Sequence, residues 1–145
     1  MSIEDKPGFK NAFELLSKMT HQEQKRIIDS IEKLEPKLAR ALRSSFYQID
    51  DLQYLNPGDL ARLLQGIDIS TFSTALRGAN DETRKHVISN VSSRMKDEIE
   101  ESIHGAPQAV ERVTAAIDVI IAKLIKKVET GEISLIREDN DQIID

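Results

Sequence analysis

The apolar residues of this chain recur every three or four positions along almost its whole length, which is the spacing of one face of an α-helix. The alternation of apolar and polar residues that is typical of a half-buried strand is nearly absent. We therefore predict an all-α fold built from short helices. The apolar stripes before residue 48 are Phe9, Ala12, Phe13, Leu16 and Met19, then Ile27, Ile28, Ile31 and Leu34, then Leu38, Ala41, Leu42 and Phe46.

Helix start signals divide this pattern into separate elements. Thr20 and Glu23 have the spacing of a capping box, in which each side chain satisfies a backbone N–H that the first turn leaves unpaired. Proline suits the first helical turn, so Pro36 and Pro57 each mark the start of a helix. The expected N-cap residues of the later helices are Asn56, Asn80 and either Ser92 or Ser93.

The C-terminal half contains the longest expected helix, which runs from about Pro107 to Thr130 and ends at Gly131. Its broad apolar surface predicts a central place in the fold. A shorter helix over residues 70–77 precedes it in the chain and is ended by Gly78. Short helices with short connections suit a small superhelical stack.

The length of 145 residues is that of one domain, which we expect to divide into two helical lobes. The predicted organisation is a polar lead-in over residues 1–12, an N-terminal lobe over 13–48, a C-terminal lobe over 49–136 and an acidic tail over 137–145. Within the C-terminal lobe we expect a charged helix over 92–104 and the long central helix over 107–130.

Charge and composition exclude several classes of function. The net charge of −5 and the low aromatic content of 4% argue against nucleic-acid binding, which needs clustered basic residues and stacking platforms. No apolar run approaches the length of a membrane span, and the N-terminus does not resemble a signal peptide, so we expect a cytoplasmic protein without membrane insertion. The absence of cysteine excludes disulfides and thiolate metal sites.

No residue pattern indicates catalysis. The histidines at positions 21, 86 and 104 are the only groups suited to proton transfer near neutral pH, and no two of them have i, i+4 spacing. Each is expected on a helix surface or at a cap. A phosphate-binding glycine loop, a nucleophile elbow and an H-E-x-x-H pattern are all missing from the sequence. We predict a protein that is not an enzyme and has no cofactor and no metal site.

The segment "NVSSRMKDEIEES" is the most charged helix of the chain. Met95, Ile99 and Ile103 form one apolar stripe at a spacing of four residues. The opposite side is charged and carries Arg94, Asp97, Glu98 and Glu101. Such a face is either solvated surface with weak pairs such as Arg94 with Glu98, or a recognition surface that steers a partner by complementary charge.

The order of several segments resembles the C-terminal domain of the bacterial flagellar motor-switch protein FliG. The segments are "LARLLQGID", "ALRGA", "ISNVSSR" and "ETGEI", and the likeness extends from about Phe13 to Ile136. The resemblance implies an armadillo-like helical domain of the flagellar basal body, at the cytoplasmic face of the inner membrane, with a role in motility and chemotaxis. It also implies that the charged helix faces the cytoplasmic loop of the stator subunit MotA, and that FliM and full-length FliG are rotor partners.

The family's functional charges carry over in part. Arg77 stands where the family has a lysine in "ALKGA", and Arg94 matches an arginine that follows an "NMS" segment. Glu101 falls on the first of two family aspartates, whereas the second is Ser102 here. After the helix this chain reads "GAPQAV" and lacks the family's arginine. The resemblance therefore implies partner binding by Arg77, Arg94, Asp97, Glu98 and Glu101, with fewer positive charges than in the family.

A second departure concerns the hinge between lobes. The family has "MFVF" where this chain has Phe46, Tyr47, Gln48 and Ile49. The resemblance implies a hinge that permits reorientation during reversal, so Gln48 and Ile49 predict altered switching. Packing of Phe46 and Ile49 in the core is the alternative interpretation of the same residues.

Length is the largest departure, because no segment corresponds to the family's N-terminal domain or to most of its middle domain. We expect a short stand-alone FliG-like paralogue or a fragment, which another protein would have to bring into the ring. Two functions remain open from the sequence. One is a rotor or switch component that contacts the stator and contributes to torque or switching, and the other is a helical adaptor or assembly module that no longer generates torque.

Overall fold

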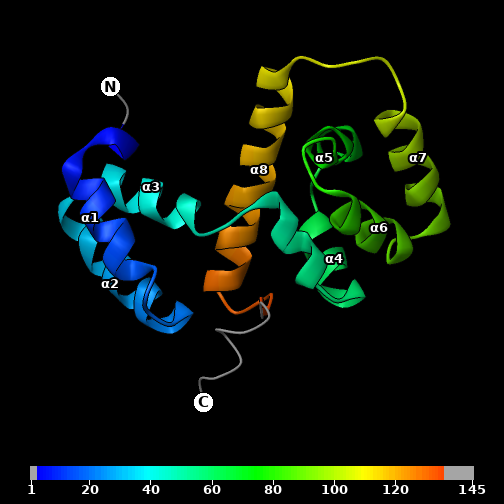
Figure 1. Cartoon of the computed structure of the whole chain (residues 1–145). Coiled ribbons are helices and arrows are strands. Elements are labelled where there is room, and N and C mark those ends of the chain that lie inside the picture. Colours follow the sequence, from blue (N-terminus) through cyan, green and yellow to red (C-terminus); the bar gives the residue numbers. More distant parts are fainter. Residues whose placement is uncertain (1–2, 136–145) are drawn as a thin grey trace. The chain divides into compact units, whose positions relative to one another are not determined.

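The computed structural model describes residues 3–135, and within this range every regular element is a helix (Figure 1). The prediction of an all-α fold is therefore confirmed. The elements are the 3-10 helices η1 (Ile3–Asp5) and η2 (Ile49–Tyr54) and the α-helices α1 (Pro7–Leu16), α2 (His21–Leu34), α3 (Pro36–Ser45), α4 (Pro57–Leu64), α5 (Ile69–Leu76), α6 (Asp81–Ser89), α7 (Ser93–Ile103) and α8 (Val110–Glu129).

The described chain forms two compact units, residues 3–47 and residues 48–135. We call them unit 1 and unit 2. The division falls between Tyr47 and Gln48, inside the segment for which the sequence predicts a hinge. The acidic tail expected over residues 137–145 lies outside the described residues.

Unit 1 consists of η1 and the helices α1, α2 and α3, which enclose one apolar core. Phe13 stacks with both Phe9 and Phe46, with ring centroids 5.9 and 4.9 Å away. The polar lead-in expected over residues 1–12 is shorter in the structure, because α1 already begins at Pro7. Pro7 occupies the first helical turn, where its missing N–H costs nothing, and Phe9 in the same helix is buried.

The capping box at the start of α2 is confirmed. The Glu23 backbone N–H donates to Thr20 Oγ1 at 3.1 Å, and the Thr20 backbone N–H donates to Glu23 Oε1 at 3.0 Å. These bonds from Thr20 stabilise the carboxylate and lower the pKa of Glu23 below its ordinary value. The proline starts are also confirmed, since α3 begins at Pro36 and α4 begins at Pro57.

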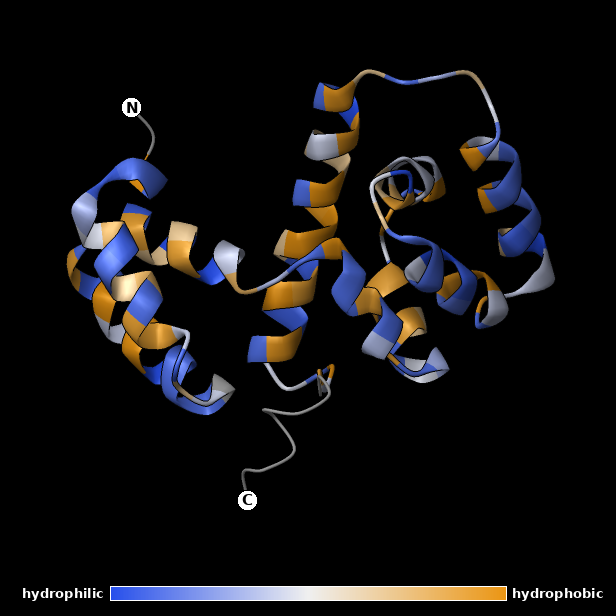
Figure 2. Ribbon diagram, in the orientation of Figure 1, coloured by the Kyte–Doolittle hydropathy of each residue, from blue (hydrophilic) through white to orange (hydrophobic). Residues whose placement is uncertain are grey.

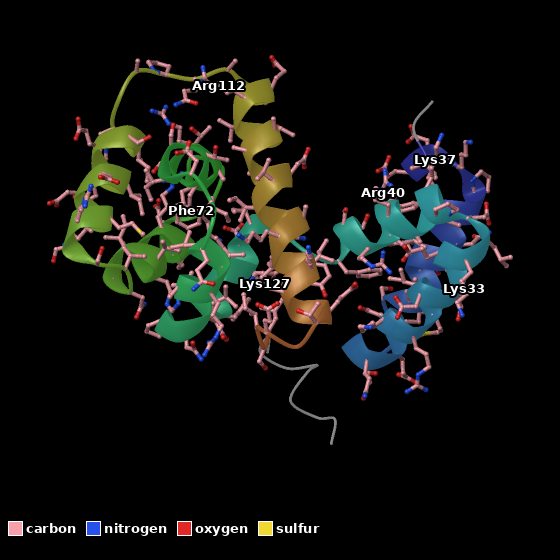
Figure 3. The ribbon with its side chains drawn as sticks, turned by 180° about the vertical axis from the view of Figure 1, so that it is seen from behind. Lys33, Lys37, Arg40, Phe72, Arg112 and Lys127 are labelled. Carbon is pink, nitrogen blue, oxygen red and sulfur yellow. The ribbon has the colours of Figure 1, made fainter. Side chains whose placement is uncertain are left out.

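The most buried helix of unit 2 is α5, which packs against α7 on one side and α8 on another (Figure 1). All five residues from Phe72 to Leu76 are buried, and Phe72 lies in the interior of the unit (Figure 3). The small residues Ser73, Thr74 and Ala75 give α5 a narrow cross-section that lets neighbours approach closely. The sequence predicts a central place for the long helix α8, which packs against α5, α4 and η2. One face of α8 is buried, but Val119 on α8 is 52% exposed.

The long helix also begins later than predicted, at Val110 rather than near Pro107. Since α7 and α8 both pack on α5, the chain between them must cross that helix. Residues 104–109 make this crossing as a loop (Figure 1). The crossing explains why Pro107, a good first-turn residue, does not start the helix here.

A polar cluster joins η2 to α6. The Asp50 carboxylate accepts hydrogen bonds from the Asn80 backbone N–H at 2.8 Å and from the Thr83 hydroxyl at 3.0 Å. Asn80 is the N-cap of α6, as predicted, and its side-chain oxygen accepts from the Thr83 backbone N–H. His86 Nε2 donates to the Leu55 carbonyl at 2.6 Å. His86 was expected on a helix surface or at a cap, but it forms a partly buried bridge between two elements.

Candidate functional site

The charged face of α7 has the geometry that the sequence predicts. Ser92 is the N-cap, and its hydroxyl accepts a hydrogen bond from the Met95 backbone N–H at 3.2 Å. Ile99 is fully buried where α7 packs against α5 and α6, and Met95 and Ile103 are half-buried. Figure 2 shows a mainly hydrophilic ribbon along α7, with apolar residues at intervals. The buried stripe fixes the helix, so the charges on its other side are held on a rigid support.

Four of the five predicted partner-binding residues lie exposed on this face: Arg94, Asp97, Glu98 and Glu101. The Arg94 side chain is 91% exposed, and its Nε lies 3.6 Å from Glu98 Oε1. This ion pair joins residues one turn apart on the same helix, so it leaves both groups accessible. We call these four residues the α7 charged face.

Lys96 is an exposed cation of α7 to which the sequence pattern assigns no site. Its position, one residue after Met95, places it at the flank of the apolar stripe rather than opposite to it. The signal that would have found it is its place in the first turn of α7, which contains Arg94 and Lys96 and no acidic residue.

Arg77 differs from the other four predicted residues. It is the C-cap of α5, it is only partly exposed, and its Nη2 donates to the Ser102 carbonyl near the end of α7. The last carbonyls of a helix have no partner within the helix and carry partial negative charge, so they attract a cation. The guanidinium therefore joins the ends of two helices, and Arg77 does not extend the α7 charged face.

Gly78 allows the turn that carries Arg77 to lie close to α8. A Cβ at this position would be 2.7 Å from Ile117 Cδ1 and 3.2 Å from Val113 Cγ1. Both of these atoms are at the ends of α8 side chains, so any larger residue would have to displace them. The absence of a side chain at Gly78 therefore lets the end of α5, which carries Arg77, pack closely against α8.

The predicted hinge residues lie at the division between the units. Phe46 is half-buried and stacks on Phe13, while Tyr47 and Ile49 are buried. Gln48 is exposed, and its backbone N–H donates to Asp51 Oδ2 at 2.9 Å, which starts η2. The burial of Phe46 and Ile49 agrees with core packing and is equally compatible with a hinge whose ends are anchored.

The remaining titratable groups do not assemble into a site. Within residues 3–135 no three His, Cys, Asp or Glu side chains are grouped so that they could hold a metal ion. His104 is the C-cap of α7 and is exposed. In the same range, no helix combines the length and the apolar character needed to cross a lipid bilayer.

A sequence profile described as "FliG C-terminal domain" matches residues 29–135. The chain belongs to this family. The match covers all of unit 2, including the α7 charged face, together with the end of unit 1. The resemblance that the sequence motifs indicated is thereby confirmed.

Relatives in the FliG family come from several bacteria. The chain is 27% identical over 141 residues to the flagellar motor switch protein FliG of Thermotoga maritima and 26% identical over 138 residues to that of Bacillus subtilis. In both cases the match covers 94% of this chain and 41% of the relative. The chain thus spans about two fifths of the length of the curated FliG proteins it matches.

Solved FliG structures have the same fold. Full-length FliG from Aquifex aeolicus matches with a TM-score of 0.72 and 23% identity, over 90% of this chain and 40% of that one. A fragment of FliG from H. pylori, residues 116–343, matches with a TM-score of 0.63 and 23% identity, over 93% of this chain and 60% of that one. These likenesses place the described helices in the FliG fold.

Proposed function

We propose that this chain is a rotor component of the flagellar motor switch that contacts the stator through the α7 charged face. Membership of the FliG C-terminal domain family supports the flagellar role. The exposure of Arg94, Asp97, Glu98 and Glu101 supports α7 as the contact surface. The partner is the cytoplasmic loop of the stator subunit MotA, and the contact contributes to torque generation or to switching.

Weak electrostatic contacts suit a surface that must bind and release repeatedly. An exposed ion pair contributes only about 0.2 to 1 kcal/mol, so it can break quickly. Its range is about 8 Å at physiological salt, so approach is steered only at close distance. The fully buried Ile99 beneath the charges keeps them in place between contacts.

The observation that carries this proposal is the state of Arg94. Its side chain is 91% exposed and its ion pair with Glu98 is 3.6 Å long and lies within α7. Because this ion pair is exposed and weak, little free energy is lost when Arg94 leaves Glu98 for an acidic group of a partner. A buried Arg94 bonded to its own backbone would have served only the fold.

Charge reversal tests the proposal. We expect Arg94→Glu and Glu101→Lys to reduce swimming and stator binding severalfold in cells whose motility depends on this protein. The matched control is Asp118→Lys, which reverses an exposed charge on α8 and is expected to leave both unchanged. Normal motility and stator binding in both α7 variants would remove the assignment.

A second candidate function is favoured by Arg77. Because its guanidinium binds the Ser102 carbonyl, the exposed cations on and beside the α7 charged face are Arg94 and Lys96. A face with few positive charges suits a helical adaptor or assembly module that no longer generates torque. Co-purification separates the two functions, since flagellar rotor and stator proteins support the first and an unrelated set supports the second.

The other partners follow from the same proposal. FliM and full-length FliG are the expected rotor neighbours, at the cytoplasmic face of the inner membrane. Phe46, Tyr47, Gln48 and Ile49 are proposed as the hinge that lets unit 2 reorient during reversal. The position of these residues at the division between the units supports this role.

A further inference from the structure

A groove opens on unit 2 between α4 and the start of α7. It has a volume of about 340 Å³, which falls in the range of sites that hold small ligands or single side-chain anchors. Its lining is mainly apolar. The lining residues are Pro57, Ala61, Leu64 and Gln65 from α4 and the turn after it, and Asn90, Val91, Ser92 and Met95 from the α6–α7 turn and α7.

The surroundings of the groove carry positive charge. Arg94 and Lys96 flank Met95 in the first turn of α7, and both are exposed. That turn contains no acidic residue, so the positive partial charge of the helix N-terminus is not offset there. On the other side, Lys123 of α8 donates from Nζ to the carbonyl of Gln65, which lines the groove.

Two acids near the groove are paired, and Asp97 lies on the side of α7 opposite to the groove residue Met95. Glu98 lies one turn along α7 and pairs with Arg94 at 3.6 Å. Asp59 of α4 pairs with Arg62 at 2.8 Å. An apolar groove that lies beside the basic residues Arg94 and Lys96 therefore fits a segment in which apolar side chains are flanked by carboxylates.

The chain itself contains such a segment after the last described residue. Residues 137–145 read "REDNDQIID", with four acids, one base and the adjacent apolar pair Ile143 and Ile144. We propose that this tail binds the groove of its own chain, with Ile143 and Ile144 as apolar anchors and its carboxylates toward Arg94 and Lys96. This contact rests on the groove and not on the flagellar function proposed above, although it shares Arg94 with the α7 charged face.

The connection is long enough for the contact. The Ile133 backbone N–H donates to the Lys127 carbonyl at 3.1 Å, so the chain leaves α8 beside Lys127. Lys127 is one helical turn, about 6 Å, from Lys123, whose Nζ contacts the groove residue Gln65. The eight residues from Ile136 to Ile143 can span up to about 26 Å when extended. A connection this short also gives the tail a high effective concentration at the groove.

Methyl NMR tests the proposal on the full chain, because Met95 lines the groove and Met19 of unit 1 provides an internal reference. We compare the full chain with a chain that ends at Ile136, which retains every described element, and with the double variant Ile143→Asp/Ile144→Asp. The control in the tail is Asn140→Ala, which keeps both anchors and all charges. We expect the Met95 methyl signal to move in the truncated chain and the double variant, and to stay in the control, with Met19 unchanged throughout.

Addition of a synthetic peptide of residues 137–145 to the truncated chain should return the Met95 signal toward its position in the full chain. The affinity of this peptide should fall severalfold between low and high salt, and the peptide with both isoleucines replaced by aspartate should not bind. Ala61→Asp, at an exposed groove position, should weaken the peptide severalfold, whereas Ala122→Asp on α8 should not. Identical Met95 signals in the full and truncated chains would overturn the proposal. A signal that depends on protein concentration would also contradict it, because the tail would then come from a second copy.

Discussion

At the scale of single residues, Glu132 has a role that follows from its neighbours. Its carboxylate accepts a hydrogen bond from Lys127 Nζ at 2.7 Å, just after Gly131 has turned the chain with a φ of +83°. The bond from Lys127 is the main cause that lowers the pKa of Glu132 below its ordinary value of 4.5. The pair helps to fix the segment that contains the buried residues Ile133 and Leu135.

We predict that Glu132→Gln lowers the free energy of unfolding at neutral pH and that this difference disappears in acid. The folded-state pKa is depressed, so the stabilisation by Glu132 is complete above the ordinary pKa and is lost as the pH falls through the lower folded-state value. Urea unfolding of both proteins at several pH values between about 7 and 3 measures the difference. A difference that stays constant over that range would show that the charge of Glu132 is not the cause.

Arg77 illustrates what a sequence leaves open at this scale. Its position before Gly78 suggested an exposed cation of the partner-binding surface. Its actual acceptor is the carbonyl of Ser102, which is 25 positions away in the chain. A bond of this kind depends on how α5 and α7 pack, and helical periodicity contains no information about that packing. The exposure of Arg94, in contrast, followed directly from its angle to Ile99 within one helix.

At the scale of elements, the helix starts were the most predictable features. Thr20, Asn56, Asn80 and Ser92 all act as N-caps, because a cap needs only its own side chain and a backbone N–H three residues later. The start of α8 at Val110 rather than near Pro107 and the deep burial of α5 did not follow from the sequence pattern. Both depend on tertiary packing, since α5 is covered by α7 and α8 and the loop between them must cross it.

The cap of α7 gives a prediction at this scale. The sequence left Ser92 and Ser93 as alternatives, and the structure assigns the cap to Ser92. Ser92→Ala removes the acceptor for the Met95 N–H and should cost about 1 kcal/mol of stability. Ser93→Ala is the matched control, because Ser93 is exposed in the first turn and is not the cap, so we expect little change. Equal losses in the two variants, measured by urea unfolding, would contradict the assignment.

At the scale of the whole molecule, the residues that hold the fold differ from those that we propose to meet a partner. Reversal of Arg94 and Glu101 changes only exposed groups, so we expect less than about 0.5 kcal/mol change in stability. Ile99→Ala empties a fully buried position under the same face and should cost about 2 to 5 kcal/mol. Thermal unfolding should therefore show nearly unchanged melting for the charge variants and a clear decrease for Ile99→Ala. A comparable decrease in all of them would mean that the charges belong to the fold.

Site-specific photocrosslinking in motile cells detects whether the α7 charged face touches the stator, as we propose. A photoreactive amino acid is placed at Asp97 in the middle of the face or, as a control, at Asp118, which is exposed on α8. We predict a crosslinked product with the cytoplasmic loop of MotA from position 97 and none from position 118. Absence of that product at position 97, or equal amounts from both positions, would contradict it.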